Sequence, residues 1–210
     1  MHMPLNNGGG DFTPPPAGTH IAICYRVIDL GTQKIEWQGS AKEQHKVLLS
    51  WELPGELMED GRPFTISKRY TLSSHEKSTL RKDLEAWRGK AFTDADFGPG
   101  GFDIASIIGK ACLLSIVHTE KDGKTYANIN SLSRLAKGME APEITNERLY
   151  LSLSAEPGKF VSAVMDKLSD GLQDTIRKSP EYQAIVRGRS QPADEAPPHD
   201  DFADLEAIPF

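Results

Sequence analysis

The amino-acid sequence predicts a mainly β protein of the α+β class, built as one domain with appendages. Residues 19 to about 135 contain five runs of strand-forming residues, several with alternating apolar and polar positions. The apolar spacing becomes that of a helix once within this region, between the third and fourth runs. The pairs Asp60-Gly61 and Asp122-Gly123 mark tight turns between neighbouring runs.

Each expected strand is rich in Ile, Val, Leu, Thr or aromatic residues, which suit a pleated and half-buried surface. The five expected strands are Gly18–Leu30, Gln44–Leu53, Arg62–Leu72, Lys110–Glu120 and Lys124–Leu135.

A helix is expected between the third and fourth strands. Ser74 can cap its start, Leu80, Leu84 and Trp87 share one apolar stripe, and Gly89 ends it. The order of three strands, a helix and two strands is that of a five-stranded oligonucleotide/oligosaccharide-binding (OB) barrel. The sequence therefore predicts an OB-like barrel, and other small β-barrels and α+β domains share the same order of elements.

The chain divides into four parts by composition. We expect a flexible leader at 1–18, the OB-like barrel domain at 19–135, a mixed and partly helical extension at 136–189, and a disordered acidic tail at 190–210. All 24 Lys and Arg residues and 24 of the 30 Asp and Glu residues lie in 1–189, so the body is neutral. The net charge of −6 therefore resides in the tail.

The extension contains an apolar stripe at helical spacing, formed by Val161, Val164, Met165 and Leu168. This stripe predicts a helix that packs on the barrel or forms the interface of a homo-oligomer. The two cysteines are expected to be buried thiols. The sequence contains no apolar run long enough for a membrane helix and no visible signal peptide, so we expect a cytoplasmic protein that does not bind membranes.

Acidic residues precede an Ile-Pro-Phe ending in the tail. They resemble the C-terminal tip of bacterial and phage single-stranded-DNA-binding proteins (SSBs), although Leu205 and Ala207 depart from that pattern. The resemblance covers Asp200, Asp201, Asp204, Glu206, Ile208, Pro209 and Phe210. It implies a protein that coats single-stranded DNA in replication or recombination and recruits host or phage replication and repair proteins through the tip. The alternative is a solubilising tail with a chance ending.

A second, weaker resemblance covers residues 70–92, which are similar to a segment found in proteins of tailed phages and prophages. It implies a phage or prophage origin.

Binding single strands without sequence preference requires cations for the phosphates and flat rings for the bases. We expect Trp51, Tyr70 and Trp87 in the core, because each shares a face with apolar residues. The charges can equally belong to a solvated surface. The expected nucleic-acid-binding residues are Arg26, Lys34, Trp37, Lys46, Lys68, Arg69, Lys124 and Tyr126.

No phosphate-binding loop and no metal-ligand spacing among the histidines is present, so we expect no enzyme activity, cofactor or metal. Two alternatives remain open. The neutral body suits a protein-binding or virion accessory module that never contacts DNA. The acids Asp94, Asp96 and Asp103 lie close in sequence and can hold Mg²⁺ in a nuclease or recombination enzyme.

Overall fold

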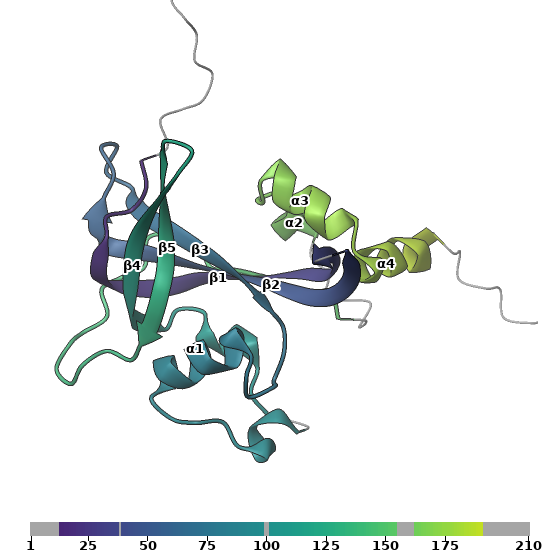
Figure 1. Cartoon of the computed structure of the whole chain (residues 1–210), viewed down its shortest axis with the longest axis horizontal. Coiled ribbons are helices and arrows are strands. Elements are labelled where there is room, and N and C mark those ends of the chain that lie inside the picture. The colour runs from purple at the N-terminus through teal and green to yellow at the C-terminus, as the bar shows by residue number, and fades with distance from the viewer. Residues whose placement is uncertain (1–12, 38, 99–100, 155–161, 191–210) are drawn as a thin grey trace, which may run out of the picture.

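One twisted sheet of six strands organises the chain, so the expected mainly β class is confirmed (Figure 1). The computed structural model describes residues 13–37, 39–98, 101–154 and 162–190. The strands are β1 (Gly18–Trp37), β2 (Ser40–Leu57), β3 (Pro63–Thr71), β4 (Ala111–Lys121), β5 (Lys124–Ser133) and β6 (Leu149–Leu151). The helices are α1 (Thr79–Arg88), α2 (Ser162–Met165), α3 (Asp170–Arg177) and α4 (Pro180–Ser190), with 3₁₀ turns at Asp94–Phe97 and Ile104–Ile107.

Five strands lie in the order β3-β2-β1-β4-β5 and pair antiparallel. Strand β1 pairs with β4 over Gly18–Ile23 and with β2 from Ile23 to Trp37. Beyond the end of β4, the short strand β6 pairs with β1 in parallel over Arg26–Ile28. The sheet is open, although residues of the edge strands β3 and β5 come within 8 Å of each other, measured between Cα atoms.

The five expected strands are present, and β1 and β2 run further than the sequence indicated. Both strands continue into a hairpin that is largely exposed beyond Gln33 and before Gln44. A strand exposed on both faces needs no alternation of apolar and polar residues, so this part carried no periodic signal.

Helix α1 begins later than expected, with Ser78 rather than Ser74 as its cap. Residues before it form a hydrogen-bonded turn, in which the His75 amide donates to Ser73 Oγ and the Ser78 amide donates to the His75 carbonyl. The helix ends where expected, because Gly89 has φ 67°, a left-handed conformation that favours glycine.

The main core lies between the inner face of the sheet and α1. Trp51 and Trp87 pack with ring centroids 5.9 Å apart, and Trp87 Nε1 donates to the Ala111 carbonyl at 2.8 Å. Tyr70 is also buried in this core, so the interpretation of these three rings as core residues is confirmed. Both cysteines, Cys24 and Cys112, are buried free thiols, as expected.

A second core lies on the opposite face of β1 and β2. Strand β6 and helices α2 to α4 cover this face, as the position of the helices beside the β1–β2 hairpin in Figure 1 shows. The expected stripe packs here through Val164, Met165 and Leu168, whereas Val161 lies outside the described residues. The buried members of this core are Ile28, Leu30, Leu48, Leu149, Leu151, Leu153, Met165, Leu168 and Ile176.

Glu52 connects the sheet to the segment that leads into β6, on the side of the second core. Its side chain is fully buried, and the residue is on the outer face of β2. Its carboxyl oxygens accept hydrogen bonds from the Thr145 and Asn146 amides, each at 2.7 Å, and from Asn146 Nδ2 at 2.6 Å. Because a buried carboxyl group needs partners, these bonds hold the segment that leads into β6 against the sheet.

The proline run of the expected leader also contacts the sheet. Pro15 is buried, and its carbonyl lies 2.8 Å from His118 Nε2, while the Pro16 carbonyl lies 3.0 Å from His20 Nε2. Residues 1–12 of the leader, like residues 191–210 of the expected disordered tail, lie outside the described residues.

We predict that Glu52→Ala lowers the free energy of unfolding by about 2–4 kcal/mol, because the Thr145 and Asn146 amides lose their acceptor and a cavity is left at a buried position. Glu52→Gln costs less, since one acceptor oxygen remains. Urea unfolding measures both variants. The control is Glu43→Gln, at a side chain that is 65% exposed, which changes stability by less than about 0.5 kcal/mol. A loss for Glu52→Ala no larger than that of the control would contradict the anchoring role.

Candidate nucleic-acid interface

The eight residues expected to bind nucleic acid lie in four places of the fold. Lys34 and Trp37 are in the β1–β2 hairpin, and Lys124 and Tyr126 are in the β4–β5 hairpin. The other four occupy the central part of the sheet: Lys46 and Arg69 on the outer face of β2 and β3, and Arg26 and Lys68 beside partners from the same chain.

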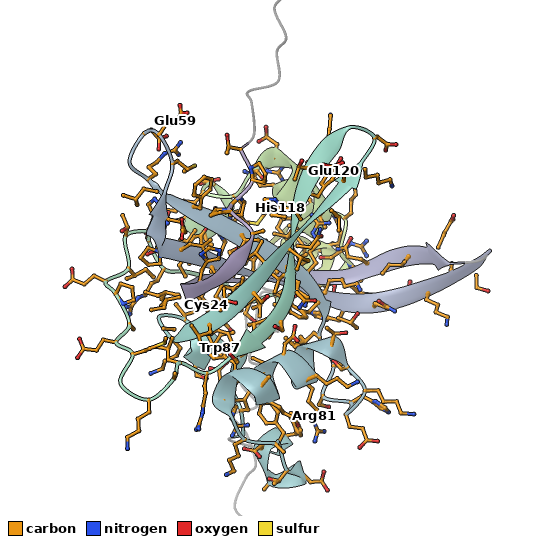
Figure 2. The ribbon with its side chains drawn as sticks, turned by 60° about the vertical axis from the view of Figure 1, so that its left-hand side comes forward. Cys24, Glu59, Arg81, Trp87, His118 and Glu120 are labelled. Atoms are coloured by element: carbon orange, nitrogen blue, oxygen red, sulfur yellow. The ribbon has the colours of Figure 1, made fainter. Side chains whose placement is uncertain are left out.

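The β1–β2 hairpin extends beyond the rest of the sheet (Figure 2). Lys34 is exposed, with its Nζ 3.9 Å from Glu43 Oε1. An ion pair of this length on an exposed surface contributes little, so Lys34 remains available to a phosphate. Trp37 is the last residue of β1 and pairs with Ser40, and its side chain lies outside the described residues.

The β4–β5 hairpin presents Lys124 and Tyr126. It projects away from α1 (Figure 1), and all residues of β4 from Val117 onward are exposed. Tyr126 is 47% exposed and pairs with Thr119 on β4. A tyrosine ring exposed on a protruding hairpin can stack on a base. The turn between the strands is the expected Asp122-Gly123, both with positive φ.

Lys46 and Arg69 lie on the outer face of the β2–β3 pair. Lys46 pairs in register with Thr71, and Arg69 pairs with Leu48, which places both cations on the face opposite the main core. Lys46 Nζ donates to Gln44 Oε1 at 2.7 Å and to Thr71 Oγ1 at 2.8 Å, and burial lowers the pKa of Lys46. Within the described part of the chain, neither cation has a carboxylate partner.

Arg26 and Lys68 have partners within the chain. Lys68 Nζ lies 2.8 Å from Asp83 Oδ2, which also accepts a hydrogen bond from the Tyr70 hydroxyl at 2.8 Å. Burial and the neighbouring Asp83 raise the pKa of Tyr70, so the hydroxyl stays protonated as a donor. Arg26 donates to the Tyr25 hydroxyl at 2.6 Å and pairs in register with Leu149 of β6. Both cations are partly buried and are therefore already engaged within the chain.

A hydrogen-bonded cluster ties α4 to the base of the β1–β2 hairpin. His45 Nε2 lies 2.6 Å from Asp29 Oδ1, and His45 Nδ1 lies 3.6 Å from Glu181 Oε1. Glu181 also accepts from the Thr32 amide at 2.8 Å, and Asp29 accepts from the Leu153 amide at 3.1 Å. The cluster therefore connects β1, β2, α4 and the residues that follow β6.

The ionisation of this cluster follows from its contacts. The hydrogen bond to Asp29 raises the pKa of His45. Burial tends to raise the pKa values of Asp29 and Glu181, but hydrogen bonds to Asp29 from His45 and backbone amides, and to Glu181 from Thr32, lower both overall. The three groups thus favour a protonated imidazole between two carboxylates.

The acids of the alternative nuclease site support the local backbone. Asp96 accepts from the Thr93 amide at 2.7 Å and the Thr93 hydroxyl at 2.9 Å, contacts that lower the pKa of Asp96. Asp103 accepts from the Ala105 amide at 2.9 Å, and Asp94 is exposed. Among the described residues, no group of three or more His, Cys, Asp or Glu side chains could hold a metal ion.

Two hollows beside α1 were not expected from the sequence. One is apolar, has a volume of about 340 Å³ and includes the exposed side chains of Leu72 and Phe97. The other has a volume of about 360 Å³ and is lined by polar residues between Thr71 and Thr79. The run of Ser, Thr, His and Lys over 73–79 could have indicated the polar hollow, but the sequence analysis placed most of that run in the first turns of the helix.

No protein-family model matches the chain, and no curated protein matches it. None of the helices in the part of the chain that the structure describes is long and apolar enough to cross a membrane.

We predict that stability falls as the pH rises through the raised pKa of His45, because the bond between a protonated His45 and Asp29 is fully present below the ordinary histidine pKa of 6.5 and is lost above the raised value. The lowered pKa values of Asp29 and Glu181 affect stability at low pH, where the contribution of these carboxylates is lost as the pH falls through those values. Urea midpoints measured between pH 5.5 and pH 8.5 test this dependence.

His45→Gln is expected to flatten that decline, whereas the control Glu43→Gln, at an exposed side chain on the same strand, leaves it unchanged. A wild-type decline that persists unaltered in His45→Gln would contradict the assignment.

Proposed function

We propose that the protein is a single-stranded-DNA-binding protein of a phage or prophage, with an OB-like barrel that coats the strand and a C-terminal tip that recruits replication or repair proteins. It performs no chemistry and requires no cofactor. It acts in the cytoplasm of the host cell.

The order of the strands supports an OB-like barrel. The order β3-β2-β1-β4-β5 leaves β3 and β5 as the edges that meet in a barrel of this type, and these two strands approach each other. Helix α1 connects β3 to β4, and its Trp87 packs against Trp51 inside the curved sheet. The long strand β1 is shared between β2 and β4, so both halves of the sheet depend on it.

One observation carries the proposal: six of the expected residues coincide with the regions that OB folds use for oligonucleotides. Those regions are the face of strands 2 and 3 and the loops between strands 1 and 2 and between strands 4 and 5. The residues are Lys34, Trp37, Lys46, Arg69, Lys124 and Tyr126.

These residue types suit a single strand. Lysine and arginine release counterions from the phosphates, and an exposed ring such as that of Tyr126 stacks on any base. A duplex hides its bases in the stack, so a site that depends on stacking prefers the unpaired strand. Preferential binding then keeps DNA open by mass action.

The tail supports the recruiting role. Residues 200–210 lie outside the described residues, and the proposal for them rests on their sequence. A terminal phenylalanine ring and carboxylate can enter an apolar pocket with a basic rim on another protein, and Pro209 reduces the entropy lost on docking. The acidic residues repel phosphates, which keeps the tail away from the bound DNA.

A second candidate function is a protein-binding module, and the apolar hollow beside α1 favours it. Leu72 and Phe97 are 42% and 39% exposed, and the hollow also contains Leu80, Leu84 and Phe102. Exposed apolar surface of this kind can receive an apolar side chain of a partner. Absence of binding to single-stranded DNA at low salt would leave this candidate in place of the first.

The protein is expected to bind a labelled thirty-nucleotide oligo-dT more tightly than a duplex of equal length, with an affinity that falls as salt rises. Tyr126→Ala is expected to weaken binding by about 1–3 kcal/mol through the loss of one stacked base. Fluorescence anisotropy measures both effects. The matched control is Tyr150→Ala, which removes a ring 43% exposed on β6, a strand that carries none of the eight expected nucleic-acid-binding residues. Equal losses in the two variants would argue against a stacking role for Tyr126.

Deletion of Phe210 is expected to abolish binding to a host protein that recognises SSB tips, because the ring that fills the pocket is lost. DNA affinity is expected to remain equal or to rise slightly, because the tail does not contribute to the grip on DNA. Calorimetry with the purified partner and anisotropy with oligo-dT separate the two effects. Unchanged partner binding would count against recruitment through the tip.

A further inference from the structure

The C-terminal extension covers part of the surface to which single-stranded DNA could bind. On the outer face of β2, Leu48, Ser50 and Glu52 are buried. Leu48 packs in the second core with residues of β6, and Glu52 is held by the segment that leads into β6. The face of strands 2 and 3 that OB folds commonly use is therefore closed along β2 from Leu48 to Glu52, whereas Lys46 lies before this covered part. What stays open on this face is the row on β3, where Thr65, Ser67 and Arg69 are exposed.

This open row continues into the polar hollow between β3 and α1. The hollow holds about 360 Å³, and its lining contains four hydroxyl groups, an imidazole and an ammonium group but no carboxylate. Glu76, the one acid within residues 71–79, does not line it. The lining residues are Thr71, Ser73, His75, Lys77, Ser78 and Thr79.

Lys46 extends the positive charge of the hollow toward Arg69. Its ammonium group lies 2.8 Å from the hydroxyl of Thr71, which is itself part of the lining. Its other partner is the amide oxygen of Gln44, so its charge is oriented without being neutralised. Arg69 is two residues before Thr71 on β3 and shares its face of the strand.

His75 is oriented as a hydrogen-bond donor. Its Nδ1 accepts a hydrogen bond from the Lys77 amide at 3.1 Å. The neutral ring therefore carries its proton on Nε2, and this N–H is the group left to bind a ligand. A donor of this kind beside an ammonium group and several hydroxyls suits the oxygen atoms of a phosphate.

We propose that Arg69, Lys46 and the hollow lined by residues 71–79 form one track for consecutive backbone phosphates of single-stranded DNA. This inference rests on the proposed function and adds to it the path of the DNA, which follows β3 toward the start of α1 because β2 is covered from Leu48 to Glu52. The sequence-based residue set included Arg69 and Lys46 but not His75 or Lys77. The Thr71 hydroxyl donates to Gln44 Oε1, so the hydroxyls of Ser73, Ser78 and Thr79 are the ones that donate to phosphate oxygens. Such donors read no base, which agrees with binding that ignores sequence.

The test compares two double variants of the full chain in oligo-dT anisotropy over 50–200 mM salt. His75→Gln with Lys77→Gln alters the hollow, and Lys90→Gln with Lys110→Gln removes two exposed lysines elsewhere as the control. We expect the first pair to weaken binding by about tenfold at low salt and to reduce the slope of log affinity against log salt by about 0.7 for each phosphate that the variant no longer neutralises. The control pair should change affinity less than twofold. Circular dichroism verifies the fold of each variant.

Lys46→Gln is expected to act in the same direction, whereas Lys46→Arg keeps the charge and most of the affinity. If the wild-type protein binds oligo-dT and the His75/Lys77 variant binds equally well with the same salt slope, the track is wrong while the proposed function stands. If the wild-type protein does not bind oligo-dT at low salt, the proposed function fails, and the track fails with it. Amide NMR shifts confined to 69–79 on titration with oligo-dT would support the track independently.

Discussion

The fold depends on how β1 satisfies its backbone. This strand is hydrogen-bonded to β4 over its first residues, to β6 beyond the end of β4, and to β2 along its remaining length. Buried amides and carbonyls require partners, so three segments far apart in sequence must assemble on one strand. The curvature of the sheet, the main core under α1 and the second core under the extension all follow from this shared strand.

Burial on both faces distinguishes the centre of the sheet from its ends. Around Trp51 one face packs on α1, and around Leu48 the other packs on β6 and the following helices. The two hairpin ends have no such cover and carry the exposed cations and rings. A central scaffold with exposed, polar ends is a common division between structure and binding. Here the cover also decides which part of the central face remains open to a ligand.

Much of the sheet over residues 19–135 could be predicted from the sequence, because alternation in the strands, the apolar stripe of Leu80, Leu84 and Trp87, and the Asp122-Gly123 turn are local signals. The position of β6 and of helices α2 to α4 on the outer face of the sheet could not be predicted in the same way. Strand β6 has three residues, too few for a period, and its position is determined by contacts with β1 and Glu52. Such contacts join residues roughly a hundred positions apart, which no local pattern encodes.

The candidate site shows the same limit. Residue types identified cations and rings, and Lys124 and Tyr126 are indeed on an exposed hairpin. The sequence did not reveal that Asp83 pairs with Lys68, because that contact depends on how α1 packs on β3. It also assigned His75 and Lys77 to a helix, and the turn that precedes the true cap places them beside a hollow instead. Contacts between elements far apart in sequence, rather than composition, determine which charged side chains remain free to bind a ligand.

The His45 cluster has a mechanical consequence for the β1–β2 hairpin. A two-stranded ribbon alone is only marginally stable in water, yet this one is braced at its base by α4 through Glu181 and Thr32. These contacts limit the range of orientations that the hairpin can adopt relative to the rest of the sheet. A ligand that reaches its tip then meets a platform whose orientation is already set, and the entropic penalty of capture is correspondingly smaller.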